Sequence, residues 1–393
     1  IGLNATFGNN NAAEGGIALV SQSGALCTSI LDWAENRDVG FSAVVSTGIA
    51  ADLDFGDILD YLASDPKTES IILYVEGLQD SRRFMSGLRA ASRIKPVIAI
   101  KAGRHAEGAA ASMSHTGALV GGDEAFTAAL NRSGVVRVDT ISQVFAAAGT
   151  LSSKYKSAGN RMAIVTNAGG PAVLAADHAP EVGLELASLS EETIAALDEA
   201  LPPTWSHRNP VDIIGDAPPE RYREAIDICL RDANVDGVLV ILTPQAMTAP
   251  VEVAEAVVEA SETNRKPIIT SWMGGAQVNP ARALFRQARI PTFNTPEAAV
   301  DAFHYLAAYK ANQTLLLQTP GRLPMEHDEP NIEAARLIIE AALNEKRDVL
   351  TEPESIALLE ALQIPTVRNG IARTAEDALV FATAMGLPVA MKF

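Results

Sequence analysis

An internal repeat limits the folds open to this chain more than any other feature. Residues 17–26 read Ile-Ala-Leu-Val-Ser-Gln-Ser-Gly-Ala-Leu, and residues 162–171 read Met-Ala-Ile-Val-Thr-Asn-Ala-Gly-Gly-Pro. In both copies four apolar residues lead into a hydroxyl residue, an amide, a small residue and glycine, and a helical pattern follows. Lys95–Gly103 and Lys266–Gly274 form a second matched pair. The chain therefore contains two halves built on one plan.

Continuous apolar runs of strand length lie between these matched segments, at Ile71–Val75 and Gly237–Leu242. Such runs, alternating with helical segments, are typical of strands that are buried on both faces of a parallel sheet. Each half is thus predicted to be a small doubly wound α/β domain. In such folds ligands bind at the carboxyl ends of the strands.

The predicted domains cover residues 1–151 and 152–318, and a linker with three prolines and mixed charges opens the segment 319–344. A helix is expected over 332–343. A third unit then begins, with strands expected at 364–367 and 388–393 around a helix that starts near residue 375. Because the chain starts at Ile1 and ends inside an apolar strand-like run, we expect it to be an internal piece of a longer protein.

Composition excludes several classes of partner. Acidic side chains outnumber basic ones 48 to 31, which gives a net charge of −17 and argues against nucleic acid. The two cysteines, Cys27 and Cys229, have neither CxxC nor Cys/His spacing, so structural zinc, or any other metal centre, and a disulfide scaffold are not expected. The apolar runs are too short to span a bilayer, and no signal sequence opens the chain, which predicts a cytoplasmic protein with no membrane partner.

The repeated turns are candidate phosphate sites. Small and hydroxyl residues at 21–24 and 166–170 lie between a strand and a helix, where free backbone N–H groups and the helix dipole can hold an anion without lysine. The alternative is that glycine and serine serve only to turn the chain tightly. No GxxxxGK[ST], GxGxxG or GxSxG motif occurs, so a P-loop, a Rossmann fingerprint and a hydrolase nucleophile elbow are not indicated.

His115 and Glu76 are the residues best suited to chemistry. His115 stands in Ser114-His-Thr-Gly117, among small residues, and a neutral imidazole nitrogen can accept a phosphoryl group; most single histidines, however, are structural. Glu76 ends an apolar strand and could orient that imidazole, or could simply begin a helix. Asn209–Asp212 could line the matching crevice or open a turn. The histidines without apparent companions are His178, His207, His304 and His327.

Taken together, these motifs resemble a known family. Ser21–Ala25, Glu76-Gly-Leu, Lys101–Arg104, Ser114–Leu119, Thr166–Gly170 and Asn209–Asp212 occur in the order found in NDP-forming acyl-CoA synthetases, the relatives of succinyl-CoA synthetase. Leu31–Glu35 and Arg82–Ser86 resemble the branch fused to GNAT lysine acetyltransferases. The resemblance implies two tandem flavodoxin-like ligase domains, the first carrying the histidine loop, and the start of an ATP-grasp domain at 345–393.

The resemblance also implies a reaction, acyl-CoA + ADP + phosphate ⇌ carboxylic acid + CoA + ATP, that passes through a phosphohistidine at His115 on a mobile loop that includes Ser114, Thr116 and Gly117. Glu76 would steady the imidazole, and Lys392 would contact the nucleotide. The implied phosphate-binding residues are Ser21, Gln22, Ser23, Gly24, Ala25, Asn167, Ala168, Gly169 and Gly170. CoA or acyl-CoA and ATP or ADP with Mg²⁺ are the implied ligands. A CoA-binding domain and the rest of ATP-grasp would lie outside this piece, which alone would be inactive.

A second function remains open from the same resemblance. In acetyltransferase-fused relatives the synthetase-like part can bind acyl-CoA and regulate a GNAT domain without catalysis. Retention of His115 favours catalysis. The resemblance also suggests a homo-oligomer.

Overall fold

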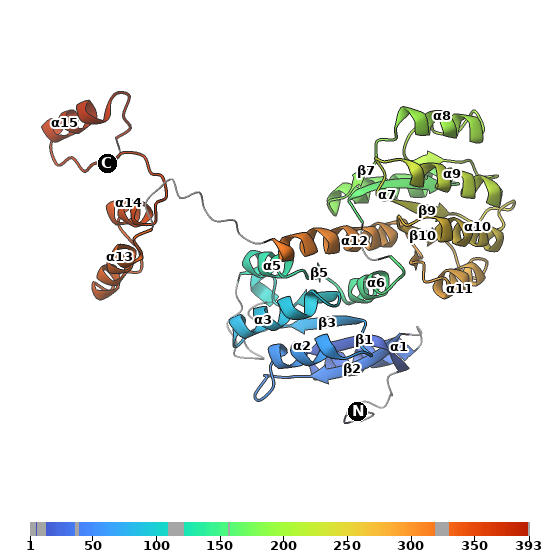
Figure 1. Ribbon diagram of the computed structural model, residues 1–393, viewed down its shortest axis with the longest axis horizontal. Coiled ribbons are helices and arrows are strands. Elements are labelled where there is room, and N and C mark those ends of the chain that lie inside the picture. The colour runs from blue at the N-terminus through green and yellow to red at the C-terminus, as the bar shows by residue number, and fades with distance from the viewer. Residues whose placement is uncertain are drawn as a thin grey trace. The chain divides into compact units, whose positions relative to one another are not determined.

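The computed structural model describes residues 5, 13–35, 39–108, 122–155, 158–318 and 330–391. The chain divides into two compact units between Gln318 and Thr319. The larger unit contains two parallel sheets, coloured from blue to orange in Figure 1, and the smaller unit contains helices shown in red. Each unit is described by itself.

The first sheet has five parallel strands in the order β2-β1-β3-β4-β5. This is the order of the flavodoxin fold, and it confirms the prediction for the first half. The strands are β1 (Ala13–Ser21), β2 (Gly40–Ser46), β3 (Ser70–Val75), β4 (Val97–Lys101) and β5 (Val136–Val138). The helices are α1 (Gly24–Glu35), α2 (Phe55–Ser64), α3 (Ser81–Ser92), α5 (Asp123–Arg132) and α6 (Ile141–Leu151).

Side chains on the strands of this sheet point alternately into two hydrophobic clusters. Ala18 and Val20 join the cluster beneath α2 and α3, whereas Leu19 joins the cluster beneath α1 and α6. On β3, Ile71 and Ile72 divide between the clusters in the same way. Alternation with both faces apolar explains why these strands read as unbroken hydrophobic runs in the sequence.

The second sheet repeats the plan of the first. Its parallel strands run β11-β10-β9-β6-β7, and β8 pairs with the carboxyl end of β6. The strands are β6 (Arg161–Thr166), β7 (Glu185–Leu186), β8 (Val211–Asp212), β9 (Gly237–Leu242), β10 (Ile268–Trp272) and β11 (Thr292–Phe293). The helices are α7 (Gly169–Glu181), α8 (Glu191–Ala200), α9 (Pro219–Arg231), α10 (Pro250–Thr263), α11 (Asn279–Gln287) and α12 (Pro296–Leu317).

Helix α12 ties the two sheets together (Figure 1). Near its end, the Asn312 side chain donates a 2.7 Å hydrogen bond to the carbonyl oxygen of Val135 beside β5. Near its start, Asp301 accepts a hydrogen bond from Gln143 on α6 and contacts His178 on α7 at 2.8 Å. One hydrophobic cluster contains buried residues from both sheets and from α12. The two halves therefore pack against the same helix and share one hydrophobic cluster.

The smaller unit contains α13 (Ile332–Asn344), α14 (Glu352–Ala361) and α15 (Ala375–Met385). The helix expected over 332–343 is thus confirmed, but the strands expected at 364–367 and 388–393 are wrong for every described residue. Isolated extended segments gain no ladder hydrogen bonds, and the described part of this unit offers no partner strand. No described helix combines the length and the apolar character needed to cross a membrane.

Candidate functional site

The first candidate site lies where the strand order of the first sheet reverses. Strands β1 and β3 are neighbours there, and the connections from their carboxyl ends leave on opposite faces, which opens a crevice in folds of this kind. The β1–α1 turn begins with Ser21, whose Oγ accepts from the backbone N–H of Ser23 and donates to its carbonyl oxygen, both at 3.0 Å. This hydroxyl fixes the shape of the turn.

Gln22 bridges the crevice from β1 to the residues after β3. Its Oε1 accepts the backbone N–H of Glu76 at 2.6 Å and that of Gly77 at 3.1 Å, while Nε2 donates to the Gly77 carbonyl oxygen at 2.9 Å. The side chain of Gln22 therefore holds the backbone of Glu76 in register with the β1–α1 turn. The sequence predicted phosphate binding for Gln22 but did not reveal this bridge.

Replacing Gln22 by methionine should lower the free energy of unfolding by about 2 kcal/mol, because three half-buried backbone groups lose their partners. Urea denaturation measures the change. Gln79→Met is the matched control, since Gln79 is exposed and makes one hydrogen bond, to the carbonyl oxygen of Ile49. Equal losses in the two variants would contradict a bridging role for Gln22.

The second candidate site repeats this geometry between β6 and β9. The Oγ1 of Thr166 accepts from the N–H of Ala168 at 3.1 Å and donates to its carbonyl oxygen at 3.0 Å. Asn167 then bridges to Thr243 after β9: Oδ1 accepts the Thr243 N–H and Nδ2 donates to its carbonyl oxygen, both at 2.9 Å. Both halves thus place a hydroxyl and a bridging amide at the point where the strand order reverses.

Both turns leave backbone donors unused at the start of a helix. The N–H groups of Gln22 and Ser23 already have acceptors, in the carbonyl of Tyr74 and the hydroxyl of Ser21. Within the described chain, the N–H groups of Gly24, Ala25, Gly169 and Gly170 have no acceptor, and α7 has no side-chain cap. These four residues are exposed, so their N–H groups and the helix dipoles form the part of each predicted site that can bind an anion.

Glu76 lies beside the first turn and does not start a helix. Helix α3 begins at Ser81, and its N-cap is Asp80, which accepts the N–H groups of Arg82 and Arg83. The helix-start alternative for Glu76 is therefore wrong. Burial, the charge of the nearby Glu76 carboxylate and its hydrogen bond with the phenol raise the pKa of Tyr74, the residue before the last one of β3.

Asn209–Asp212 contributes to the second site in two ways. Asn209 braces strand β6, because its Oδ1 accepts the N–H of Ile164 at 3.0 Å and its Nδ2 donates to the carbonyl oxygen of Met162 at 2.9 Å. Asp212 lies at the carboxyl edge, where a Cβ built on Gly169 would be 3.5 Å from its Oδ2. The side chain of Asn209 is structural, whereas the carboxylate of Asp212 faces the start of α7.

The predicted residues His115, Ser114, Thr116, Gly117 and Lys392 lie outside the described residues, so their roles stay predictions. The same holds for His327.

Other histidines do have partners, which corrects the expectation that they stand alone. His178 contacts Glu181 and Asp301, and although burial lowers its pKa, these two carboxylates raise it above the ordinary value overall. The carbonyl of Pro203 and the carboxylate of Asp198 raise the pKa of His207. Burial lowers the pKa of His304. Glu181 and Pro203 lie only three and four residues from their histidines, whereas Asp301 is 123 positions from His178 and could not be found from spacing.

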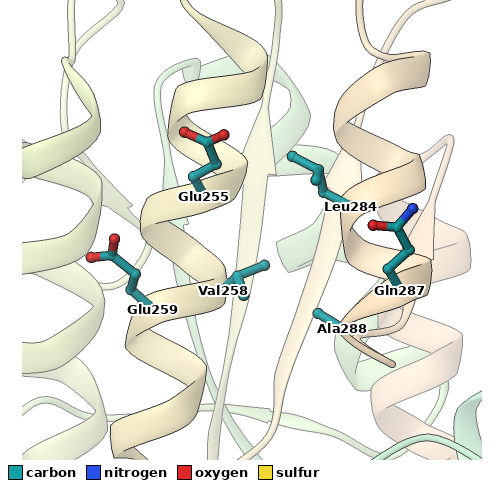
Figure 2. Close-up of a pocket in the computed structure, with 6 residues that line it drawn as sticks. All are labelled: Glu255, Val258, Glu259, Leu284, Gln287 and Ala288. Carbon is teal, nitrogen blue, oxygen red and sulfur yellow. The ribbon is translucent and has the colours of Figure 1, made fainter.

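The described residues contain no group of three His, Cys, Asp or Glu side chains that could hold a metal ion. A surface hollow between α10 and α11 is lined by Glu255, Val258, Glu259, Leu284, Gln287 and Ala288 (Figure 2). It lies on the outer surface of these helices, and none of its lining residues belongs to the two turns. The two turns lie instead at the carboxyl edges of the sheets.

Comparison with known proteins now identifies the family. Residues 14–151 match the succinyl-CoA ligase like flavodoxin domain, residues 162–314 match the ligase-CoA domain, and residues 341–393 match an ATP-grasp domain. The chain is 40% identical, over 315 residues, to the alpha subunit of acetate–CoA ligase (ADP-forming) II from Pyrococcus furiosus, covering 79% of this chain and 68% of that subunit. The chain belongs to the NDP-forming acyl-CoA synthetase family.

Two further members of the family resemble the chain. Acetate–CoA ligase (ADP-forming) I from Archaeoglobus fulgidus is 40% identical over 393 residues, which are 100% of this chain and 55% of that ligase. The chain thus spans about half the length of that relative. A solved structure of acetyl-coenzyme A synthetase 1 from Ca. Korarchaeum cryptofilum, in complex with phosphate and ADP, superposes with a TM-score of 0.74 at 34% identity, covering 81% of this chain and 70% of that one.

Proposed function

We propose that this chain is the phosphoryl-transfer part of an acyl-CoA synthetase that converts acyl-CoA, ADP and phosphate into a carboxylic acid, CoA and ATP. The observation that carries the proposal is the duplicated site. In both halves an amide bridges the point where the strand order reverses, and the next helix starts with N–H groups that have no acceptor among the described residues. Family membership supports the same reaction class.

In the proposed reaction, phosphate attacks the thioester carbon of acyl-CoA, so that the C–S bond breaks and an acyl phosphate and CoA form. A nitrogen of His115 then takes the phosphoryl group from the acyl phosphate and releases the carboxylic acid. ADP finally accepts the phosphoryl group from His115 to give ATP. Each step breaks one bond to the transferred group and forms another, and no redox partner is required.

The described residues would contribute binding and orientation. A phosphoryl dianion at a helix start gains charge-assisted hydrogen bonds from backbone N–H groups and a favourable interaction with the dipole. Gly24 and Ala25 would supply these groups in the first half, and Gly169 and Gly170 in the second. Because backbone amides carry no full charge, they would bind the phosphoryl group less tightly than an ion pair would, so that it can be transferred onward. Glu76, fixed by Gln22, would orient the imidazole of His115.

The test uses the full-length protein. It is incubated with Mg²⁺ and γ-labelled ATP, and the protein is then examined for a label that is lost in acid and stable in alkali. Such a label supports a phosphohistidine carrier, and acetate with CoA is the first substrate pair to try for its discharge. Folded protein without label would overturn the proposal and would favour the alternative, an acyl-CoA-binding module that regulates an attached acetyltransferase.

The donors at the start of α1 can be tested one at a time. Gly24→Pro removes an N–H, whereas Gly24→Ala keeps it, and both variants introduce a Cβ about 3.3 Å from the Oγ of Ser46. Proline is tolerated in the first helical turn, so the pair differs mainly in the donor. We expect the proline variant to be phosphorylated about 10-fold more slowly than the alanine variant, the value of one hydrogen bond to a charged group. Equal rates in rapid-quench labelling would exclude this N–H as a phosphate ligand.

A further inference from the structure

A cluster of charged side chains lies at the carboxyl ends of β4 and β5, outside both turns. Lys101 is the last residue of β4, and only 4% of its side chain is exposed. Its Nζ lies 3.7 Å from the Oδ1 of Asp123, donates to the carbonyl oxygen of Gly103 at 3.2 Å, and sits over the ring of Phe126. Asp123 is the first residue of α5. A buried cation thus joins the end of β4 to the start of α5.

Arg137 completes the link from β5. Its Nη2 donates to both carboxylate oxygens of Asp123, at 2.9 and 2.8 Å, and its Nη1 donates to the Asp123 carbonyl oxygen at 3.3 Å. The side chain of Arg137 is 10% exposed. Arg104, three residues beyond Lys101, forms an ion pair with Asp139, the residue that follows β5. Asp123 therefore receives two buried cations from two adjacent strands.

The cluster joins the two ends of one connection of the chain. The segment between β4 and α5 contains His115, and Lys101 and Asp123 lie at its two ends. Bringing the ends of a long segment together costs conformational entropy, which a fixed contact between the ends offsets. Burial lowers the pKa of Lys101, and Asp123 acts against that shift, so the carboxylate stabilises the charged lysine in its buried place.

The corresponding position in the second half of the repeat has no such cluster among the described residues. In the matched segments Lys101 corresponds to Trp272, and the equivalent connection, from β10 to α11, is short. There Arg282 reaches back from α11 and donates directly to the carbonyl oxygens of Trp272 and Gly274. No described carboxylate forms an ion pair with Arg282. The carboxylate-centred cluster is thus confined to the half whose connection carries His115.

We propose that Lys101, Asp123 and Arg137 are positioning residues for phosphoryl transfer, which fix the two ends of the segment that carries His115. This inference rests on the proposed function. A segment whose ends are held in one place presents its side chains to the reacting group in fewer arrangements, and small misplacements of a reacting group slow transfer strongly. The rate of His115 phosphorylation should therefore depend on these three residues, although none of them belongs to the two turns.

The experiment compares Asp123→Asn with Asp236→Asn in the full-length protein. Asp236 is a matched control, because it accepts two hydrogen bonds from the guanidinium of Arg161, each at 2.9 Å, but lies before β9, at the amino edge of the second sheet. Rapid-quench labelling with γ-labelled ATP gives the phosphorylation rate, and urea denaturation gives stability. We expect Asp123→Asn to slow labelling about 10-fold and Asp236→Asn to leave it within about twofold at similar loss of stability.

Lys101→Met provides a second variant, since it removes the buried charge and leaves the pair of Asp123 and Arg137 in place. Lys101→Met should also slow labelling. Asp123→Glu, which keeps the carboxylate, should label faster than Asp123→Asn. Wild-type rates in both Asp123→Asn and Lys101→Met, or an equal slowing in Asp236→Asn, would overturn the positioning role while leaving the proposed function standing. A wild-type protein that takes no label would overturn both.

Discussion

Replacement of His115 by alanine is expected to abolish the acid-labile phosphoryl label on the full-length protein and with it the exchange of phosphate into ATP. Alanine has no nucleophilic nitrogen, and the other candidate residues of the described site offer carboxylates, hydroxyls or amides, none of which would give a label that is lost in acid and stable in alkali. Loss of the carrier should reduce label by more than about 10²-fold, to background. Autoradiography after alkaline gel electrophoresis and mass spectrometry of the labelled peptide measure it.

His105→Ala is the control for this result. His105 is exposed and belongs to the same connection after β4, so its replacement removes an imidazole without touching a core. Label should remain at the wild-type level. If the label survived in His115→Ala and disappeared in His105→Ala, the carrier would be His105 and our assignment to His115 would be wrong.

The second large effect is expected for Glu76→Gln, which should slow phosphorylation by about 10²-fold, as loss of one preorganised electrostatic contact does in other enzymes. The amide keeps the size of the side chain. It removes the negative charge that would stabilise the imidazole of His115 as that ring becomes positively charged on accepting the phosphoryl group. The backbone hydrogen bond from Glu76 to Gln22 does not involve the carboxylate, so the fold around the turn should persist.

Glu69→Gln is the matched control for Glu76→Gln. Glu69 precedes the same strand, β3, but at its amino edge, where it forms a 3.5 Å ion pair with Arg289 and is largely exposed. Its neutralisation should change the phosphorylation rate by less than about twofold, because exposed ion pairs contribute little. If both variants labelled at the wild-type rate in rapid-quench measurements, Glu76 would have no part in orienting the histidine.

The sequence sufficed to predict the repeat and the class of sheet, because buried parallel strands leave an unmistakable apolar run such as Ile71–Val75. It could not show that Gln22 reaches Glu76, since those residues are 54 positions apart and only the strand order makes them neighbours. The apolar run after Gly386 misled the prediction for a related reason. A strand exists only with a partner, and a run of apolar residues does not say where that partner is.

The charged cluster at β4 did leave a signal that sequence reasoning missed. Within the matched segments, Lys101 occupies the position of Trp272, at the end of a strand that is otherwise apolar. A charge at a repeated buried position calls for a counter-charge, because an unpaired buried ion is costly. Its neighbours in the cluster, Asp123 and Arg137, come from a later helix and strand. The sequence could therefore have predicted that Lys101 requires a counter-charge, but not that Asp123 supplies it.

Helix α12 has a consequence for how such chains can be shuffled in evolution. The two sheets have the same plan, and they share one hydrophobic cluster and contacts with the same helix. A gene break between residues 151 and 162 would expose, in either product, apolar residues of the shared cluster that are buried in the intact chain. We therefore expect gene fusion and fission to separate residues 13–318 from their flanks more readily than to divide them.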